Sequence, residues 1–136
     1  MGPIIFVDPS VFVAILAKEP EGKAFAESIA MAERRMTSPI VRLETCIVLA
    51  SRLGVEPSQA AALFDEFVAE AEIIEISVDS SVGVSAVACF ENFGKGRHRA
   101  RLNFADRLVH ASAKTSGARL SFKGGDFSQT DVNTPA

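Results

Sequence analysis

Apolar runs alternate with amphipathic stretches along the chain, and the first blocks predict a strand followed by two helices. Residues 3–7 form a short apolar run rich in β-branched side chains, which is typical of a strand buried on both faces of a parallel sheet. A helical pattern begins at Pro9. A second helix is predicted over 20–35, because Pro20 and Glu21 suit a first helical turn and apolar residues recur on one face.

The middle of the chain continues the alternation. Residues 36–38 suit a brief strand, and a helix is predicted over 39–54, with Gly54 as its end. Another amphipathic helix begins at Pro57, and the apolar run over 73–78 indicates a strand. The residues expected to face the core are Ile40, Leu43, Ile47 and Ala50 in the first of these helices, and Ala61, Leu63, Phe64, Phe67 and Val68 in the second.

The last third of the chain repeats this order. A helix is predicted over 79–93, a basic loop over 94–101, a helix over 103–117 capped by Asn103, and a final strand over 119–122. Strands that alternate with helices predict an α/β fold in which helices wrap a mostly parallel sheet of four or five strands.

Length and composition fit this pattern. A chain of 136 residues with 48% hydrophobic content is long enough to build one core, so a single domain over 1–136 is expected. The polar residues 130–136 predict a loosely ordered tail. The apolar N-terminus lacks an early Lys or Arg, and Asp8 interrupts it, so the sequence predicts a cytoplasmic protein without a membrane span.

The net charge, the cysteines and the histidines do not indicate a nucleic-acid site or a zinc site. A net charge of −3 does not favour nucleic-acid binding over the chain as a whole. Cys46 and Cys89 lie in apolar stretches, which predicts buried reduced thiols. His98 and His110 are too isolated to form a zinc site.

Four acidic residues stand where a parallel sheet collects its reactive groups. Asp8 and Asp126 each follow a predicted strand, and ligands bind outside the carboxyl ends of such strands. Asp106 lies in the first turn of a helix, where Phe104 is expected to point into apolar surroundings and the acid elsewhere. Glu44 interrupts an apolar helical stretch. Taken singly, each acid also suits a cap, a turn or a solvated helix position.

Taken together, the four acids predict a metal site. Carboxylates that converge repel one another unless a cation neutralises them. Oxygen ligands favour Mg²⁺, or Mn²⁺ in its place, over zinc. Ser10 and Asp131 are candidates to support this cluster from its periphery, although a helix-start serine and an acid in a turn-rich segment also suit simple capping.

A basic segment immediately precedes the helix of Asp106. Its cations could hold phosphate beside the acidic residues, and the alternative is a solvated charged loop. The candidate phosphate-binding residues are Lys95, Arg97, Arg99 and Arg101, with Arg107 on the following helix.

Three segments follow one another along the chain, VDPSVFVAIL, LETCIVLA and ARLNFADRLVHASAKTSGARLSFKGGDFSQTDV. Together they resemble the PIN-domain ribonucleases, and especially the VapC-type toxins. The resemblance spans nearly the whole chain. It implies a three-layer α/β/α PIN-like fold and a Mg²⁺-dependent endoribonuclease. It also implies that the family's metal-cluster positions are Asp8, Glu44, Asp106 and Asp126.

The resemblance further implies partners, namely an RNA substrate, a cognate antitoxin protein and a second copy of the chain in a homodimer, with a higher assembly around the antitoxin. Pro9 and Arg107 depart from the residues that the family usually has at these places. Two alternatives stay open. One is a catalytically weak or inert antitoxin-binding module. The other is an aspartate-dependent phosphoryl-transfer domain, which Ser10 disfavours because a second acid commonly stands there.

Overall fold

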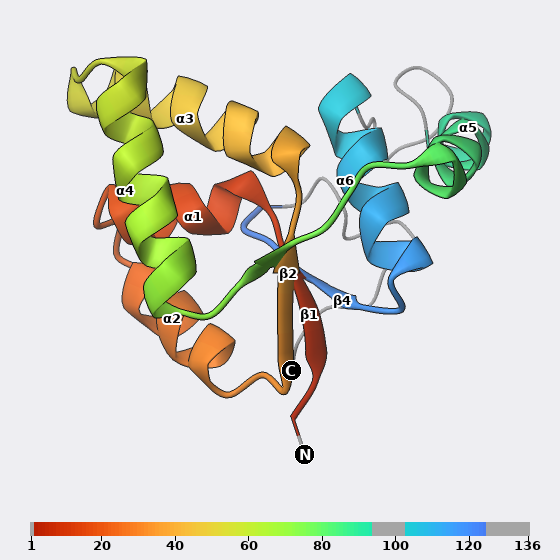
Figure 1. The fold of residues 1–136 in the computed structure, drawn as a ribbon, viewed down its shortest axis with the longest axis horizontal. Helices are drawn as coiled ribbons and strands as arrows, with labels where there is room; N and C mark the ends of the chain where they lie inside the picture. The colour runs from red at the N-terminus through yellow and green to blue at the C-terminus, as the bar shows by residue number, and fades with distance from the viewer. Residues whose placement is uncertain (1, 94–102, 125–136) are drawn as a thin grey trace.

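A parallel sheet with helices on both sides forms the framework of the protein (Figure 1). The computed structural model describes residues 2–93 and 103–124. Within these residues the sheet has four strands, all parallel, in the order β3-β2-β1-β4. The strands are β1 Ile4–Val7, β2 Arg34–Thr37, β3 Ile74–Glu75 and β4 Arg119–Ser121. The predicted α/β class and parallel sheet are confirmed.

Six helices cover the sheet within the described ranges, four on one side and two on the other (Figure 1). The first group is α1 Pro9–Leu16, α2 Gly22–Ala30, α3 Pro39–Leu53 and α4 Pro57–Glu70. The second group is α5 Ser80–Phe93 and α6 Phe104–Thr115. None of the helices in the described part of the chain has both the length and the apolar character needed to cross a membrane.

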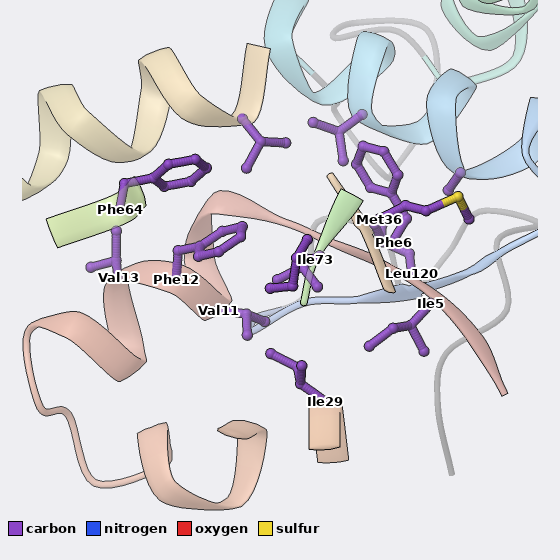
Figure 2. Packing of buried hydrophobic residues seen from close by; sticks show 14 of the residues in the cluster. Ile5, Phe6, Val11, Phe12, Val13, Ile29, Met36, Phe64, Ile73 and Leu120 are labelled. Carbon is purple, nitrogen blue, oxygen red and sulfur yellow. The ribbon is translucent and has the colours of Figure 1, made fainter. Parts of the chain in front are cut away.

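The core surrounds the central strand β1 and extends to both groups of helices (Figure 2), with Phe12 of α1 on one side and Val109 of α6 on the other. Ile5, Phe6 and Val7 of β1 are fully buried, as expected for a strand with neighbours on both edges and helices on both faces. The rings of Phe12 on α1 and Phe64 on α4 pack with their centroids 4.7 Å apart. The apolar run at the start of the sequence is therefore the centre of the fold.

The helix predicted over 20–35 is wrong at its C-terminal end. Helix α2 stops at Ala30, and Arg34 already pairs with β1 as part of β2. The chain turns early because the peptide N–H of Glu33 donates to the carbonyl of Pro3 (2.8 Å). The Arg35 guanidinium then binds carbonyl groups at the end of α2. These contacts come from tertiary structure, which overrides local helix propensity.

The strand predicted over 73–78 is also too long. Strand β3 consists of Ile74–Glu75 and pairs on one side only, with β2. One further backbone bond, from the N–H of Ile76 to the carbonyl of Thr37 (2.8 Å), extends this edge. An edge strand is limited by the length of its single neighbour, which here ends at Thr37.

The apolar face predicted for α3 is wrong at two of its residues, since Leu43 and Ile47 are each 61% exposed. The buried positions of α3 are Val41, Thr45, Cys46 and Leu49. Helix α3 packs against α1 and α4, and this packing decides which of its faces is buried.

Two other residues expected in the core are exposed. Leu63 on α4 is 37% exposed, and Ala60 is fully buried in its place. Phe104, which was expected to point into apolar surroundings, is 75% exposed.

Candidate metal centre

A pocket of about 360 Å³ opens where the chain leaves β1, and three of the four predicted acids line it. Asp8 follows β1 directly, Glu44 comes from α3 and Asp106 from the first turn of α6. The structure thus brings together side chains from three separate elements at the carboxyl edge of the sheet, where parallel sheets place their sites.

Hydrogen bonds fix both the side chain and the backbone of Asp8. It is the N-cap of α1, and its Oδ2 atom accepts hydrogen bonds from the peptide N–H of Ser10 (2.9 Å) and the Ser10 hydroxyl (2.5 Å). Its own N–H donates to the carbonyl of Ser121 at the end of β4 (3.0 Å). Both side-chain hydrogen bonds end on Oδ2. The other carboxylate oxygen, Oδ1, accepts no hydrogen bond from the described residues.

Asp106 and Glu44 face the same pocket from two helices. Asp106 forms a capping box with Asn103, in which the Asn103 N–H donates to Asp106 Oδ2 (3.2 Å) and the Asp106 N–H donates to Asn103 Oδ1 (2.8 Å). Glu44 is half-buried. The capping role that the sequence allowed for Asp8 and Asp106 is therefore real, and it coexists with their place in the pocket.

The three acids disfavour one another's charged forms. Burial raises the pKa of Asp8 to about 7, and the nearby charges of Asp106 and Glu44 add to this effect, while the hydrogen bonds from Ser10 oppose it. Burial and the charge of Asp106 also raise the pKa of Glu44. A cation bound among these groups would relieve both the burial cost and the repulsion.

The donor chemistry fits a hard divalent cation. All three acids offer carboxylate oxygens, the ligands that Mg²⁺ and Mn²⁺ prefer. Over residues 2–93 and 103–124, however, no three Asp, Glu, His or Cys side chains lie close enough together to hold a metal ion. Mg²⁺ is commonly bound through one or two carboxylates and keeps several of its waters, so the absence of a ready cage does not conflict with this donor set.

Several predicted residues have other outcomes. The Arg107 guanidinium lies over the Phe90 ring of α5, 4.5 Å from its centroid, so it packs α6 against α5. Cys46 and Cys89 are buried, as predicted. The predicted residues that lie outside the described part of the chain are Asp126, Asp131, Lys95, Arg97, Arg99, Arg101 and His98.

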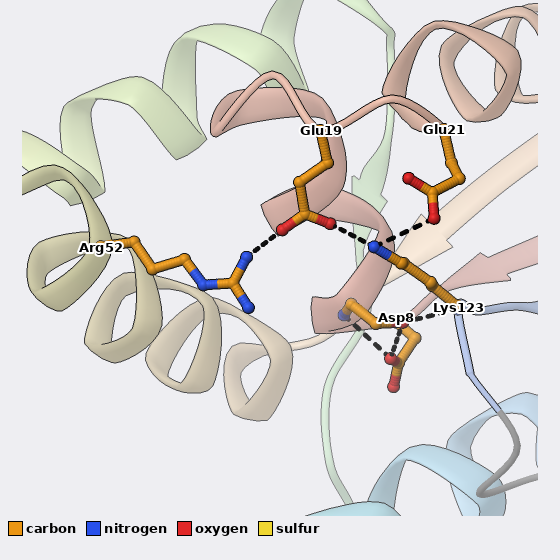
Figure 3. A network of polar contacts seen from close by, with 6 residues as sticks. Asp8, Glu19, Glu21, Arg52 and Lys123 are labelled. Atoms are coloured by element: carbon orange, nitrogen blue, oxygen red, sulfur yellow. Dashed lines mark hydrogen bonds and ion pairs between the residues drawn. The ribbon is translucent and has the colours of Figure 1, made fainter.

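The sequence did not indicate that a set of charged residues meets at the edge of the pocket (Figure 3). Lys123 forms ion pairs with Glu19 (Nζ to Oε1, 2.6 Å) and Glu21 (Nζ to Oε2, 3.1 Å), and Arg52 pairs with the second oxygen of Glu19. The hydrogen bond from Lys123 is the main reason that the pKa of Glu19 is lowered. Lys123 follows a predicted strand, as Asp8 does, and this signal could have identified it.

Comparison with known proteins gives a consistent result. The profile of the PIN domain matches residues 5–133. VapC ribonuclease Mb0640 of Mycobacterium bovis is 36% identical over 130 residues, which are 96% of this chain and 97% of that protein. Ribonuclease VapC of Mycolicibacterium smegmatis is 39% identical over 126 residues, which are 93% of this chain and 95% of the relative.

Solved structures share the fold. The Mycobacterium tuberculosis toxin VapC20, described as cleaving the sarcin–ricin loop, superposes with a TM-score of 0.72 at 25% identity over 94% of this chain and 95% of that one. VapBC2 from Rickettsia felis, bound to a DNA fragment from its promoter, gives a TM-score of 0.75 at 15% identity over 96% of each chain. A toxin–antitoxin complex from Klebsiella pneumoniae gives a TM-score of 0.66 at 17% identity, over 93% of this chain and 92% of that one.

Proposed function

The chain belongs to the PIN-domain family and, within it, to the VapC ribonucleases, and from this premise we propose that it hydrolyses RNA phosphodiester bonds with Mg²⁺ held by four carboxylates. The toxin of a toxin–antitoxin pair is the role that this membership gives it. The observation that carries the proposal is the meeting of Asp8, Glu44 and Asp106 in one pocket at the carboxyl edge of the sheet.

The metal ligands in this proposal are Asp8, Glu44, Asp106 and Asp126. When bound, Mg²⁺ supplies charge neutralisation at the scissile phosphate and makes an attacking water more acidic. The protein orients Asp8 through the two hydrogen bonds from Ser10. It presents Asp106 from a capped helix start. No side-chain nucleophile is needed, which agrees with an all-carboxylate site.

RNA is held by cations in this proposal. Lys95, Arg97, Arg99 and Arg101 precede the helix of Asp106 and remain the proposed phosphate contacts. Arg107 is a weaker candidate, because its guanidinium lies against Phe90. Asp131 remains a proposed supporting acid.

An antitoxin is the proposed protein partner, because solved relatives of this fold are toxin–antitoxin assemblies. The pocket acids have exposed apolar neighbours in sequence, with Leu43 beside Glu44 and Phe104 close to Asp106. This combination suits a peptide segment in which apolar side chains surround an Arg or Lys that pairs with the carboxylates. We also propose that the chain forms a homodimer, which sedimentation of the purified protein would reveal.

The central experiment measures RNA cleavage and Mn²⁺ binding for the wild type and for Asp8→Asn, Glu44→Gln and Asp106→Asn. We expect each variant to lose at least about a hundredfold in cleavage rate, because even the residues that only orient metal ligands commonly matter by ten- to hundredfold. Mn²⁺ affinity, measured by calorimetry without RNA, should fall in parallel. Glu66→Gln, an exposed acid on α4, is the control. Full cleavage activity in Asp106→Asn would contradict the four-carboxylate site.

A further inference from the structure

The ion pairs of Glu19 join three elements at the edge of the pocket. Glu19 follows α1, Arg52 lies in the last turn of α3, and Lys123 follows β4. Only 15% of the Glu19 side chain is exposed, compared with 47% for Glu21. The central carboxylate of this bridge is therefore partly desolvated, where charge pairing is stronger than on an open surface.

Backbone contacts fix the position of Glu19 in addition to its ion pairs. Lys18 adopts a left-handed conformation (φ 57°) and reverses the chain after α1, which for a non-glycine residue costs roughly 1–2 kcal/mol. The N–H of Glu19 donates to the carbonyl of Ala14 (2.8 Å). Gly22 then passes so close to α1 that an added Cβ would lie 2.4 Å from the carbonyl oxygen of Ala14. This tight turn is a rigid support for the bridge.

A chain of hydrogen bonds leads from Lys123 to Asp8. The peptide N–H of Lys123 donates to the Ser10 hydroxyl oxygen (2.8 Å), and the same hydroxyl donates to Asp8 Oδ2 (2.5 Å). Strand β4 ends at Ser121, so the Lys123 peptide lies beyond the residues that β4 pairs with β1. Beyond β4, Phe122 packs against the core, and Lys123 itself contacts Ser10 through its peptide and Glu19 and Glu21 through its side chain.

We propose that Lys123 is a positioning residue of the carboxylate pocket: its ion pairs with Glu19 and Glu21 hold its peptide N–H on the Ser10 hydroxyl, which orients Asp8. This inference rests on the proposed function, because it concerns how the metal-holding carboxylate is aimed. It differs from a direct contact between Lys123 and RNA, for which the ammonium group would have to leave both glutamates.

The test compares two substitutions at this position. Lys123→Met removes the charge and keeps most of the side-chain length, and Lys123→Arg keeps a cation that can reach both glutamates. Lys23→Met, at an exposed position of α2, is the matched control. Three quantities are measured on the purified chain: Mn²⁺ affinity without RNA, KM and kcat for an RNA substrate, and the melting temperature without metal.

Lys123→Met is expected to weaken Mn²⁺ binding about tenfold or more, the usual effect of removing a group that orients a metal ligand. KM for RNA should stay close to the wild-type value, and the melting temperature should fall only slightly, because Arg52 still pairs with Glu19. Lys123→Arg should restore most of the Mn²⁺ affinity, and Lys23→Met should change nothing. If Lys123→Met does not fold, Glu19→Gln replaces it, and the same loss of Mn²⁺ affinity is expected.

Two results would overturn the inference alone. One is wild-type Mn²⁺ affinity in Lys123→Met, and the other is a raised KM for RNA with Mn²⁺ affinity unchanged, which would mean that Lys123 contacts RNA. In both cases Asp8→Asn would still bind Mn²⁺ more weakly than the wild type, so the proposed function would stand. If the wild type binds no Mn²⁺, or Asp8→Asn binds it equally well, the proposed function fails and the inference fails with it.

Discussion

Burial of Asp8 makes the stability of the protein depend on pH. The carboxyl group titrates near 3.8 in the unfolded chain and at about 7 in the folded protein. Between these values the folded protein keeps a proton that the unfolded chain has lost. The free energy of unfolding therefore falls as pH rises from about 4 to about 7, by up to roughly 4 kcal/mol for the full shift. Above this window the cost is fully present.

Asp8→Asn should remove this cost without removing the helix cap, because Asn caps helices as well as Asp does. We expect the metal-free variant to be more stable than the wild type at pH 8, by roughly 1–4 kcal/mol in urea unfolding. Mn²⁺ should raise the melting temperature of the wild type more than that of the variant. Equal pH dependence of stability in the two proteins would contradict a buried, raised-pKa Asp8.

For single residues, the sequence predicted the positions of the pocket acids better than the ion pairs of the charged residues beside them. Asp8 and Asp106 stand at a strand end and a helix start, positions that the local pattern marks, and both line the pocket. Glu19 and Arg52 meet across a large separation in sequence. No local pattern tells which distant charge a glutamate will find, so their pairing had to come from the structure.

Among the elements, the junction of α2 and β2 depends on one side chain. The Arg35 guanidinium donates to the carbonyl oxygens of Ile29 (2.8 Å), Ala30 (3.0 Å), Ala32 (3.2 Å) and Ala71 (2.9 Å). These carbonyls lie at the ends of α2 and α4, where the helix dipole favours a cation. One residue thereby satisfies backbone groups that two helix ends leave without intrahelical partners.

Arg35→Met should lower the free energy of unfolding by roughly 1–3 kcal/mol, because several partly buried carbonyl acceptors lose a charged donor at once. Arg35→Lys should recover less than half of this loss, since an ammonium group lacks the planar fork of the guanidinium. Arg34→Met, on the same strand but exposed, should change stability by less than about 0.5 kcal/mol. Urea unfolding measures all three, and equal effects of Arg34→Met and Arg35→Met would contradict this role.

The sequence located every strand and helix that the structure describes, but it misjudged boundaries and one helix face. Arg34 and Arg35 continue a helical pattern, and only the pairing with β1 makes them a strand. On α3 two apolar stripes compete, and the one that contains Leu43 and Ile47 is exposed while the one that contains Val41 and Leu49 is buried. Helix periodicity identifies the stripes, whereas packing against α1 and α4 decides which of them is buried.

At the scale of the whole molecule, α5 lies on the outside of α6, away from the central strand (Figure 1). It packs chiefly against α6, and Val84 and Val87 are 74% and 68% exposed. Segments with few buried contacts open locally at a lower free energy than the core. Amide hydrogens of α5 should therefore exchange before those of β1 in hydrogen-exchange mass spectrometry of the isolated chain. Equal protection of α5 and β1 would indicate that a partner copy or another contact covers this helix.

The strand order has a consequence for the time at which the protein becomes active. Strand β1 is made first and lies in the centre of the sheet, yet its neighbour β4 belongs to the far end of the described chain. Asp8 is fixed by Ser121 and Ser10, and Ser10 in turn by Lys123. While the ribosome is still making the chain, these late residues are missing and the site cannot assemble. In a nascent chain of this topology, the proposed site forms only after β4 and Lys123 have been made.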